Sequence, residues 1–284
     1  MANRFDYLAL GHITLDRQPD GRFLPGGTVT YGGLQAARLG LHTGILTAGN
    51  PTDFVGPLEP YHDELTIEMQ PTRAATVFVN VGSGAARQQT VEAWAGVIDL
   101  TRAALDARII HLAPVARELD AERLPEFPAE TFVGATPQGW LRSWGADGHV
   151  REGELVLPPA LTRRLDALVM SDSEAPKTVA ASAAVRAAGG IVVVTRGAAG
   201  CTLYLRDGEC DVPAIRCPVV DDTGAGDIFA AAFFVALTEG QSPVEAARFA
   251  NAAAGLSIGG LGVAGIARRA AVEQALREEM GGHD

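Results

Sequence analysis

Lysine is almost absent from this chain of 284 residues: Lys177 stands alone among 23 basic residues, so that 23 − 1 = 22 of them are arginines. The phosphate loop of the common nucleotide triphosphatases needs a lysine in the pattern G-x-x-x-x-G-K-[ST], and no such pattern is present. The glycine fingerprint of dinucleotide-binding folds is missing too, because residues 11–14, after the first predicted strand, lack the G-x-G-x-x-G spacing.

Excess positive charge and long apolar runs are also lacking. The formal net charge is −11, which argues against nucleic acid or an anionic membrane as the main partner. No stretch approaches the ~20 apolar residues of a membrane span. Residues 1–6 include an acid and lack a signal-peptide core. We therefore expect a cytoplasmic protein without a nucleic-acid or membrane partner.

Cysteine and aromatic residues are few. The three cysteines, Cys201, Cys210 and Cys217, are odd in number and lack metal-ligand spacing, which predicts free thiols. We expect Cys201 and Cys217 to lie in strands as small core residues. The six histidines have no ligand spacing either and are expected to be structural.

What the sequence has instead is an alternation of short apolar runs with helical segments. This pattern predicts an α/β fold with a central, mostly parallel sheet flanked by helices. Two polar alternating pieces, residues 65–69 and 76–81, suit a small antiparallel β lid better than a buried sheet. We expect one domain over residues 1–284, with a discontinuous lid at roughly 12–26 and 65–90. The predicted strands are 7–10, 43–47, 108–112, 131–134, 165–170, 191–195 and a hairpin at 201–212, and the predicted helices are 31–39, 179–188, 228–238, 243–256 and 269–279.

One motif carries most of the chemical information: residues 220–227, V-D-D-T-G-A-G-D, run directly into the apolar segment 228–237. Glycines at 224 and 226 let backbone N–H groups approach a ligand closely. These groups would lie at the positive end of a helix dipole, which favours anions and should keep Asp227 ionised. A carboxylate beside an anion hole can take a proton from a hydroxyl while the N–H groups stabilise a phosphoryl group.

Three further side chains are candidates by position. Gln138 and Arg142 follow a predicted strand end, where ligand-binding groups gather in open α/β sheets. Arg87 follows the glycine-rich stretch 82–84 of the predicted lid and could reach over a bound substrate. A solvated surface position is an equally open alternative for both arginines.

Taken together, these motifs resemble the ribokinase-like (PfkB) carbohydrate kinase superfamily over nearly the whole chain. Gly26-Gly27 is similar to its N-terminal signature glycines, and Asp16 to its acid that binds substrate hydroxyls. Residues 195–200, T-R-G-A-A-G, resemble the T-[KRL]-G-x-x-G nucleotide-phosphate turn, and 221–227 resemble D-T-x-G-A-G-D. Residues 251–262 resemble the adenine-side helix and its closing glycine loop.

The resemblance implies roles for these residues, with ATP as donor and Mg²⁺ as metal. Asp227 would be the catalytic base. The implied sites are an anion hole at Gly224, Ala225 and Gly226; an acceptor site at Asp16, Gly26, Gly27, Arg87, Gln138 and Arg142; a nucleotide site at Thr195, Arg196, Gly197, Gly200, Asn251 and Gly262; and Glu174 as the acid that orders Mg²⁺-bound water. A monovalent cation such as K⁺ is left open.

The chain departs from the family pattern at two positions. Asp222 stands where the family usually has Thr, Pro or Ser, and an extra acid there would repel phosphates unless it points outward or holds a cation. Ser171 replaces Asn in the N-x-x-E motif, which weakens the metal assignment without removing it, since Mg²⁺ is held largely by phosphates and water.

Within the family, residues 25–31 and 136–142 are most similar to short inositol-kinase-type members. The leading hypothesis is an ATP-dependent kinase that phosphorylates a small polyol, cyclitol or sugar. A nucleoside kinase is the alternative, which the low aromatic content of 6% makes less favourable because few rings are available to sandwich a base. A non-catalytic ligand-binding protein is a third reading. Monomer and homodimer both stay open.

Overall fold

The computed structural model describes residues 4–81, 88–101 and 103–281. Its centre is a nine-stranded sheet in the order β15-β14-β13-β12-β9-β8-β1-β4-β5. All neighbours pair in parallel except β13–β14 and β14–β15, which are antiparallel. The strands are β1 (Phe5–Leu10), β4 (Thr43–Gly49), β5 (Thr66–Pro71), β8 (Ala107–Leu112), β9 (Phe132–Ala135), β12 (Ala167–Ser171), β13 (Ile191–Thr195), β14 (Cys201–Leu205) and β15 (Gly208–Val212).

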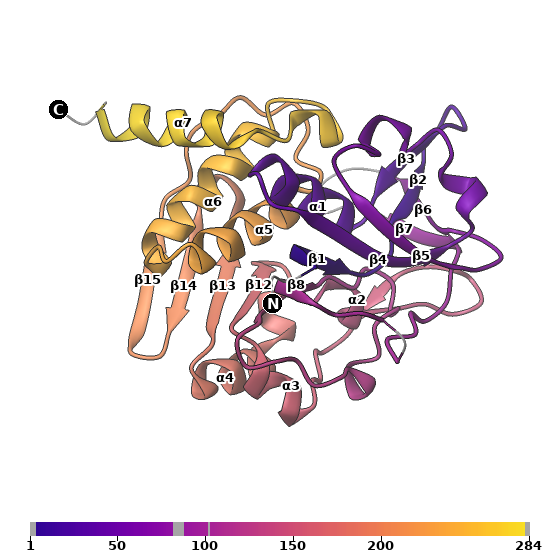
Figure 1. Cartoon of the computed structure of the whole chain (residues 1–284), viewed down its shortest axis with the longest axis horizontal. Coiled ribbons are helices and arrows are strands. Elements are labelled where there is room, and N and C mark those ends of the chain that lie inside the picture. Colours follow the sequence, from indigo (N-terminus) through magenta and orange to yellow (C-terminus); the bar gives the residue numbers. More distant parts are fainter. Residues whose placement is uncertain (1–3, 82–87, 102, 282–284) are drawn as a thin grey trace.

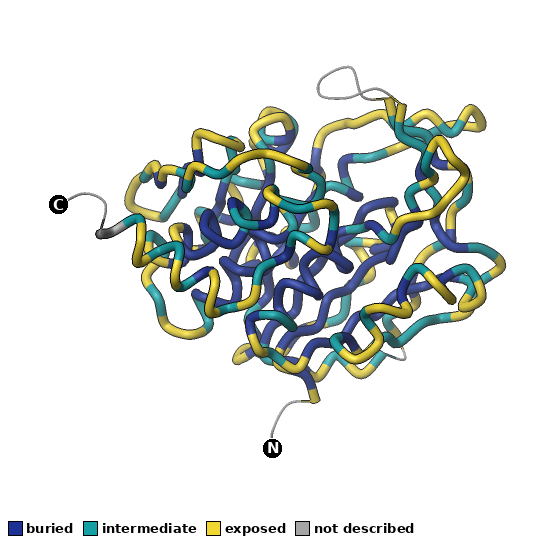
Figure 2. The backbone as a smooth tube through the Cα atoms, turned by 90° about the horizontal axis from the view of Figure 1, so that it is seen from above, coloured by how far each residue is buried: buried dark blue, intermediate teal, exposed yellow. Residues whose placement is uncertain are grey.

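Helices cover both faces of this sheet, as the nearly continuous burial along its central strands requires, because successive side chains point to opposite faces. One face packs against α1, α5 and α6, with α7 lying on α6, and the other face packs against α3 and α4 (Figure 1). The buried centre and exposed loops are visible in Figure 2. The helices are α1 (Thr28–Arg38), α2 (Gln138–Leu141), α3 (Pro159–Arg164), α4 (Val179–Ala188), α5 (Ala225–Thr238), α6 (Pro243–Ser257) and α7 (Arg269–Gly281), and short 3₁₀ turns include η5 (Ala175–Lys177), η6 (Gly197–Ala199) and η7 (Gly262–Gly265).

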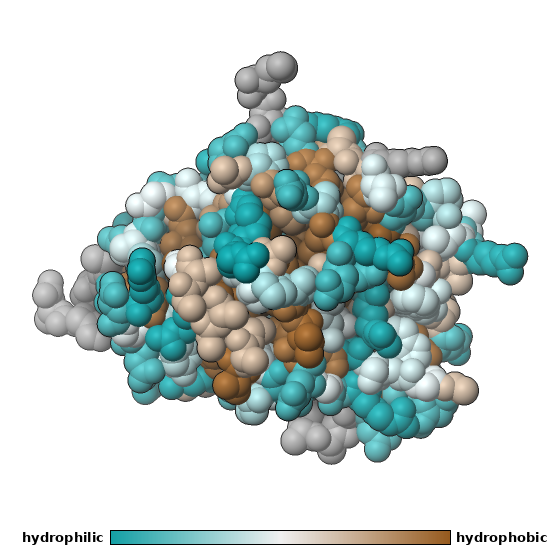
Figure 3. Space-filling model, turned by 90° about the horizontal axis from the view of Figure 1, so that it is seen from below, coloured by the Kyte–Doolittle hydropathy of each residue, from teal (hydrophilic) through white to brown (hydrophobic). Residues whose placement is uncertain are grey.

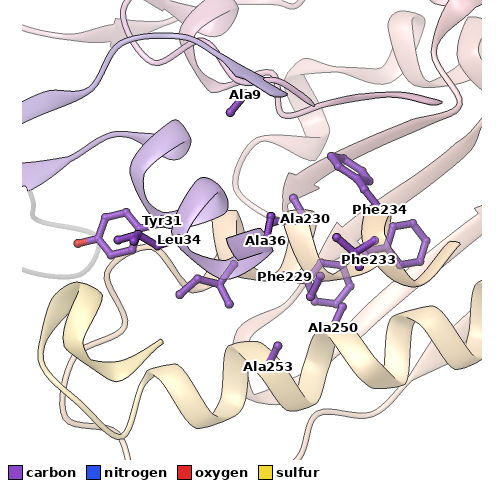
Figure 4. Packing of buried hydrophobic residues seen from close by; sticks show 14 of the residues in the cluster. Ala9, Tyr31, Leu34, Ala36, Phe229, Ala230, Phe233, Phe234, Ala250 and Ala253 are labelled. Carbon is purple, nitrogen blue, oxygen red and sulfur yellow. The ribbon is translucent and has the colours of Figure 1, made fainter. Parts of the chain in front are cut away.

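Helix α5 lies in the middle of the upper layer. Every residue from Ile228 to Ala236 is buried, so the helix is apolar all round, as a core helix must be. It packs between α1 and α6, where small side chains such as Ala230, Ala250 and Ala253 let the backbones approach (Figure 4). This packing fixes the N-terminus of α5, and with it the motif at 220–227, against the start of α1.

A separate four-stranded sheet forms the lid, in the order β3-β2-β6-β7. Its strands are β2 (Thr14–Arg17), β3 (Phe23–Gly26), β6 (Thr76–Val81) and β7 (Gln88–Ala93). The expectation that residues 65–69 belong to the lid is wrong, because β5 pairs in parallel with β4 as the edge of the large sheet. Half-exposed alternation is typical of any edge strand, so the pattern could not separate the two sheets.

A short hairpin after α2 fastens the lid to the body. Strands β10 (Arg142–Ser143) and β11 (Arg151–Glu152) pair antiparallel, and the turn between them lies along β7. Val91 N–H donates to Gly148 O at 2.8 Å, and Val150 N–H donates to Gln89 O at 2.9 Å. Trp94 and Trp144 meet edge to face with ring centroids 5.9 Å apart. No sequence pattern predicts this hairpin.

The predicted fold class is confirmed: a mostly parallel sheet between helical layers, with a small β lid. All three cysteines are free thiols; Cys201 is buried in β14 as expected, but Cys217 lies outside any strand and is half-buried, so that expectation is wrong. Within the described ranges, no helix is long and apolar enough to cross a membrane. Apolar and polar side chains are interspersed on the face seen in Figure 3.

Candidate active site

The motif at 220–227 forms a tight turn that leads into α5. Gly224, the N-cap residue, has φ of 78°, a left-handed conformation that favours glycine. A Cβ there would stand 2.2 Å from Cδ1 of Tyr31 in α1, so the turn lies directly on that ring. Asp221 holds the turn in place, because its carboxylate accepts from Thr223 N–H at 3.0 Å and from Gly262 N–H at 2.9 Å.

Asp227 stands in the first turn of α5 and faces the start of α1. Its Oδ1 accepts a hydrogen bond from Thr28 Oγ1 at 2.9 Å. Burial raises the pKa of Asp227 to about 6; the Thr28 hydrogen bond lowers it, Glu174 raises it and Arg142 lowers it. Desolvation thus outweighs the helix dipole, which was expected to keep this acid ionised, in setting its pKa. At pH 7 the group is still mostly ionised, with a pKa suited to a general base.

In front of Asp227 opens a cavity of about 1150 Å³ between the lid, the β10–β11 hairpin and the carboxyl ends of the central strands. Six of the residues singled out from the sequence line it: Asp16, Gly27, Gln138, Arg142, Gly224 and Asp227. The other lining residues are Thr14, Thr28, Tyr31, Phe78, Gln88, Gln89, Val115, His149, Val150, Arg151, Glu152, Ser171, Ser173, Lys177, Asp222 and Thr223.

The lid side of the cavity is built around Asp16 and the Gly26-Gly27 pair. A Cβ on Gly26 would stand 2.8 Å from Thr14 Oγ1 and 3.0 Å from Asp16 Oδ2. Gly27 has φ of 88°, and a Cβ there would stand 2.4 Å from His12 O. Glycine at both positions thus lets β3 pass close to β2 and brings Asp16 to the wall of the cavity.

Arg142 lies on the opposite wall and is held rigidly. Its Nη1 donates to Val115 O at 2.9 Å, and its guanidinium lies 5.4 Å from the ring centroid of Phe78. Burial lowers the pKa of Arg142, while the carboxylates of Glu152, Glu174, Asp227 and Glu118 raise it. The side chain therefore supplies a fixed positive charge to the region between Asp227 and Glu174.

Tyr31 is a cavity residue that the sequence did not reveal. Burial raises the pKa of its hydroxyl, and the nearby carboxylates of Asp16, Asp227 and Asp221 raise it further. Its ring packs on Gly224, so it links the acceptor side of the cavity to the anion-binding turn. No local pattern marks it, because a tyrosine in the first turn of an apolar helix is expected in the core.

The residues assigned to the nucleotide lie beside this cavity and do not line it, as far as the described residues show. Arg196 donates to Asp211 at 2.8 Å, and the turn at 196–200 is closed by Arg196 N–H donating to Gly200 O at 2.7 Å. Asn251 is buried in α6, and its Nδ2 donates to Pro213 O at 2.9 Å. Thr195 ends β13, with its hydroxyl donating to Met170 O at 3.3 Å.

Glu174 and Ser171 together replace the expected metal motif. Oε2 of Glu174 accepts from both the N–H and the hydroxyl of Ser171, each at 2.8 Å. The serine thus orients the acid at the end of β12. Among the described residues, no group of three or more His, Cys, Asp or Glu could hold a metal ion. This donor set fits Mg²⁺ only where phosphates and water supply most of its ligands, which is the usual mode for this ion. Arg87 lies outside the described residues.

Comparison with known proteins finds the family that the sequence motifs resemble. Residues 162–268 match the model of the pfkB family carbohydrate kinases. Over 107 residues, 36% of the chain, it is 44% identical to "Bifunctional protein HldE" of Azorhizobium caulinodans, and over 60 residues, 21% of the chain, it is 45% identical to "Inositol 3-kinase" of Arabidopsis thaliana. These matches span 22% and 17% of the two proteins' own lengths.

Solved structures extend the likeness to the whole chain. A pyrophosphate-dependent kinase in the ribokinase family superposes with a TM-score of 0.78 at 18% identity, covering 94% of this chain and 99% of that one. Ribokinase from Thermotoga maritima superposes with a TM-score of 0.69 at 21% identity, covering 96% and 99%. The resemblance read from the motifs is thereby confirmed: residues 162–268 carry a pfkB family carbohydrate kinase sequence, and the chain as a whole has the ribokinase fold.

Proposed function

We propose that this protein is a phosphotransferase that moves a phosphoryl group from ATP to a hydroxyl of a small cyclitol, polyol or sugar. The observation that carries the proposal is Asp227: a partly buried carboxylate with a raised pKa of about 6, at the N-terminus of α5, facing a large polar cavity. A base with this pKa can accept the proton of a substrate hydroxyl near neutral pH.

The turn next to Asp227 supplies the second half of the reaction. Backbone N–H groups of Ala225, Gly226 and Asp227, at the positive end of α5, stabilise the negative charge that develops on the transferred phosphoryl group. Ala225 N–H also contacts Asp222 O at 3.2 Å, so Gly226 and Asp227 carry more of this role. Arg142 adds a fixed cation on the other side of the same space.

The donor is proposed to be ATP because an apolar shelf lies beside this turn. Val219, Val220 and Leu261 are exposed, and their segments are joined by Val220 N–H donating to Ile258 O at 2.7 Å. Such a surface suits a purine base. Leu261 belongs to the segment 251–262, and the next residue, Gly262, donates its N–H to the Asp221 carboxylate at 2.9 Å. We keep Thr195, Arg196, Gly197, Gly200, Asn251 and Gly262 as the proposed nucleotide residues. Pyrophosphate is the competing donor, because a similar structure is that of a pyrophosphate-dependent kinase.

Mg²⁺ is proposed to enter with the donor. When bound, it would neutralise charge on the donor phosphates. Glu174, oriented by Ser171, would hold its water ligands. A monovalent cation such as K⁺ remains a proposal without a described site.

The acceptor is proposed to lie between Asp16 and Asp227, under the lid. Asp16 and the Gly26-Gly27 backbone would orient its hydroxyls, with Gln138 opposite; Arg87 would act from the lid. A cyclitol or sugar is favoured over a nucleoside because Phe78, one of the two aromatic rings in the cavity wall, is already covered by Arg142. A cytoplasmic protein that acts as a monomer or homodimer is consistent with this chemistry.

A screen of donors against acceptors tests the proposal. ATP and pyrophosphate, each with Mg²⁺, are incubated with myo-inositol and other cyclitols, pentoses, hexoses and nucleosides, and ADP or phosphate release is measured. Phosphorylation of one polyhydroxy acceptor that Asp227→Asn abolishes is the expected result. If no acceptor yields product above the donor's own hydrolysis, the kinase proposal is wrong and a ligand-binding role takes its place.

Asp16 gives a separate test of where the acceptor lies. Asp16→Ala removes a carboxylate that can accept two hydroxyl hydrogen bonds, so the acceptor KM should rise by a factor equivalent to a few kcal/mol, with little change in the donor KM. Steady-state kinetics with each substrate varied in turn measure this. Equal effects on both KM values would contradict the acceptor role.

A further inference from the structure

The only lysine of the chain lines the candidate active site. Lys177 closes η5, directly after the Ser171–Glu174 motif, and shares the cavity wall with Ser171 and Ser173. Its Nζ donates to Glu152 Oε2 at 2.6 Å and to Ser173 O at 3.3 Å. Lys177 therefore bridges the end of β12 to the β10–β11 hairpin across one rim of the cavity.

Two arginines, Arg142 and Arg151, also line the cavity wall, and each has a partner. Arg142 is fixed by its bond to Val115 O and its contact with Phe78. Arg151 points to Asp147, with Nη2 at 2.5 Å from Oδ2. The Arg151–Asp147 pair is more open to water still, at 59% and 43%, but it lies within the β10–β11 hairpin and its turn. The pair of Lys177 (34% exposed) and Glu152 (32%) instead joins that hairpin to the end of β12, beside Ser171 and Ser173. A pair so open to water adds little stability and exchanges readily for a stronger partner.

A polyphosphate is such a partner. It carries more negative charge than one carboxylate, and the flexible four-carbon stem of lysine lets the ammonium swing through several positions, which a planar guanidinium does less easily. The hydroxyl of Ser173 lies on the same wall, 2.9 Å from that of Ser171. Ser171 donates its own proton to Glu174, so Ser173 is the hydroxyl that can turn to donate to a phosphate oxygen. The acids Glu152, Asp222 and Asp227 stand around these hydroxyls and repel a phosphate chain. A mobile cation beside the chain offsets this repulsion.

We propose that Lys177 is the mobile phosphate-binding cation of this site, which leaves Glu152 to contact the terminal phosphates of the donor. This inference rests on the proposed phosphotransferase function and names a residue of the donor site that the family motifs do not include. The ligand class is a di- or triphosphate chain. Lys177 is a binding residue here, and Glu152 is a positioning residue that holds its ammonium group at the cavity rim.

Because Lys177 is the sole lysine, the reactivity of its side-chain amino group can be measured without interference from other lysines. Acetylation with isotope-coded acetic anhydride modifies Lys177 and the terminal amino group of the chain, and peptide mass spectrometry reports the two rates separately. At a donor concentration about ten times its dissociation constant, mass action predicts roughly tenfold slower acetylation of Lys177. Pyrophosphate and ATP should both protect; adenosine, which has no phosphate, should not; and the terminal amino group serves as the internal reference.

Kinetics supply the second readout. Lys177→Gln should raise the KM of the donor by roughly tenfold or more, the equivalent of one charged hydrogen bond, and leave the acceptor KM unchanged. Lys177→Arg, which keeps the charge, should recover part of the loss. Arg123→Gln is the matched control, because it also removes a cation paired with a carboxylate, Asp120, but on an exposed turn away from the cavity.

The outcomes separate this inference from the proposed function. Protection of Lys177 by pyrophosphate or ATP supports it, even if no acceptor is ever phosphorylated, in which case the kinase proposal fails alone. Equal acetylation rates with and without donor overturn it, whether or not the protein turns over. A folded Lys177→Gln variant with a normal donor KM, in an active enzyme, overturns it as well.

Discussion

Helices α5 and α6 pack against each other, yet their N-termini are built in opposite ways. α6 begins with a complete capping box: the Ser242 side chain accepts from Glu245 N–H, and the Glu245 side chain accepts from Ser242 N–H. α5 begins at Gly224, with no side-chain cap. Because α6 satisfies its first N–H groups with its own side chains, its start can serve structure alone, whereas α5 leaves its first N–H groups to partners outside the helix.

The difference shows how α5 can do without a cap. A cap contributes about 1 kcal/mol, and α5 forgoes it. Its stability comes from burial instead, since nine consecutive residues, Ile228 to Ala236, are buried between α1 and α6. The N-cap position of α5 is therefore open to a ligand, and beside it Asp227 accepts a hydrogen bond from Thr28. We therefore expect substitutions at the open end of α5 to affect activity, and substitutions at the capped end of α6 to affect stability alone.

The largest effect is expected at Asp227. Asp227→Asn keeps an oxygen that can accept from Thr28 but removes the base, so kcat should fall by about 10²–10⁴. Donor affinity, measured by calorimetry or by the Lys177 protection assay, should not weaken, because a negative charge near the phosphates is lost. A variant with near-native kcat would remove Asp227 from the role of base.

Gly224 and Gly226 form a matched pair within the same turn. Gly224→Ala places a methyl group in a left-handed position 2.2 Å from the Tyr31 ring, and should lower the free energy of unfolding by about 1–3 kcal/mol. Gly226 has open space around its missing Cβ, so Gly226→Ala should leave the fold intact. It should still raise the donor KM and lower kcat, because the methyl group enters the proposed phosphoryl site.

Thermal unfolding and kinetics on both variants check this pair. From the sequence, both glycines are expected to let a ligand approach closely, whereas in the structure Gly224 alone also has a packing reason, its contact with the Tyr31 ring. A Gly226→Ala enzyme with unchanged kinetics would show that the phosphoryl group lies elsewhere.

The raised pKa of Asp227 predicts an acid limb in the pH profile. A base with a pKa of about 6 is protonated below that pH, so kcat/KM should rise with pH and level off above about 6. The stability effect has the opposite sign. The folded state binds this proton more tightly than the unfolded state, so the contribution of Asp227 to stability falls as pH rises from about 4 to about 6.

Asp227→Asn should therefore make the protein more stable at pH 7, by about 1–2 kcal/mol after allowance for partial exposure, and remove the acid limb from any residual activity. Urea unfolding of both forms at pH 5 and pH 7 measures the gain. Equal stabilities at pH 7 would mean that the carboxylate is better solvated than its position suggests.

The motif at 220–227 was readable because its chemistry is local: a glycine turn, a helix start and an acid lie within eight residues. The order of strands and helices was readable for the same reason, since alternation and β-branched runs report local burial. Helix α1 and helix α5 each begin three residues earlier than the apolar pattern indicated, because their first turns include small or polar residues of the site, such as Thr28, Gly226 and Asp227.

What could not be read depends on partners far along the chain. The sheet to which β5 belongs is decided by β4, and nothing within residues 66–71 reports that choice. Tyr31 lines the site because α1 packs on a turn almost two hundred residues later. The hairpin at 142–152 is held by the lid strand β7, and its strands of two residues are too short to leave a pattern.

The smallest effect is expected at the capped end. Ser242→Ala removes the hydroxyl that accepts from Glu245 N–H at 3.3 Å and donates to Glu245 Oε2 at 2.7 Å. The free energy of unfolding should fall by about 1 kcal/mol, or about 2 °C in Tm for a chain of this size. The pKa of Glu245, which these hydrogen bonds lower, should rise toward its ordinary value. Both KM values and kcat should stay unchanged, the reverse of Gly226→Ala. If Ser242→Ala altered the donor KM, the capped end of α6 would be coupled to the open end of α5, and the two helix starts would no longer serve separate purposes.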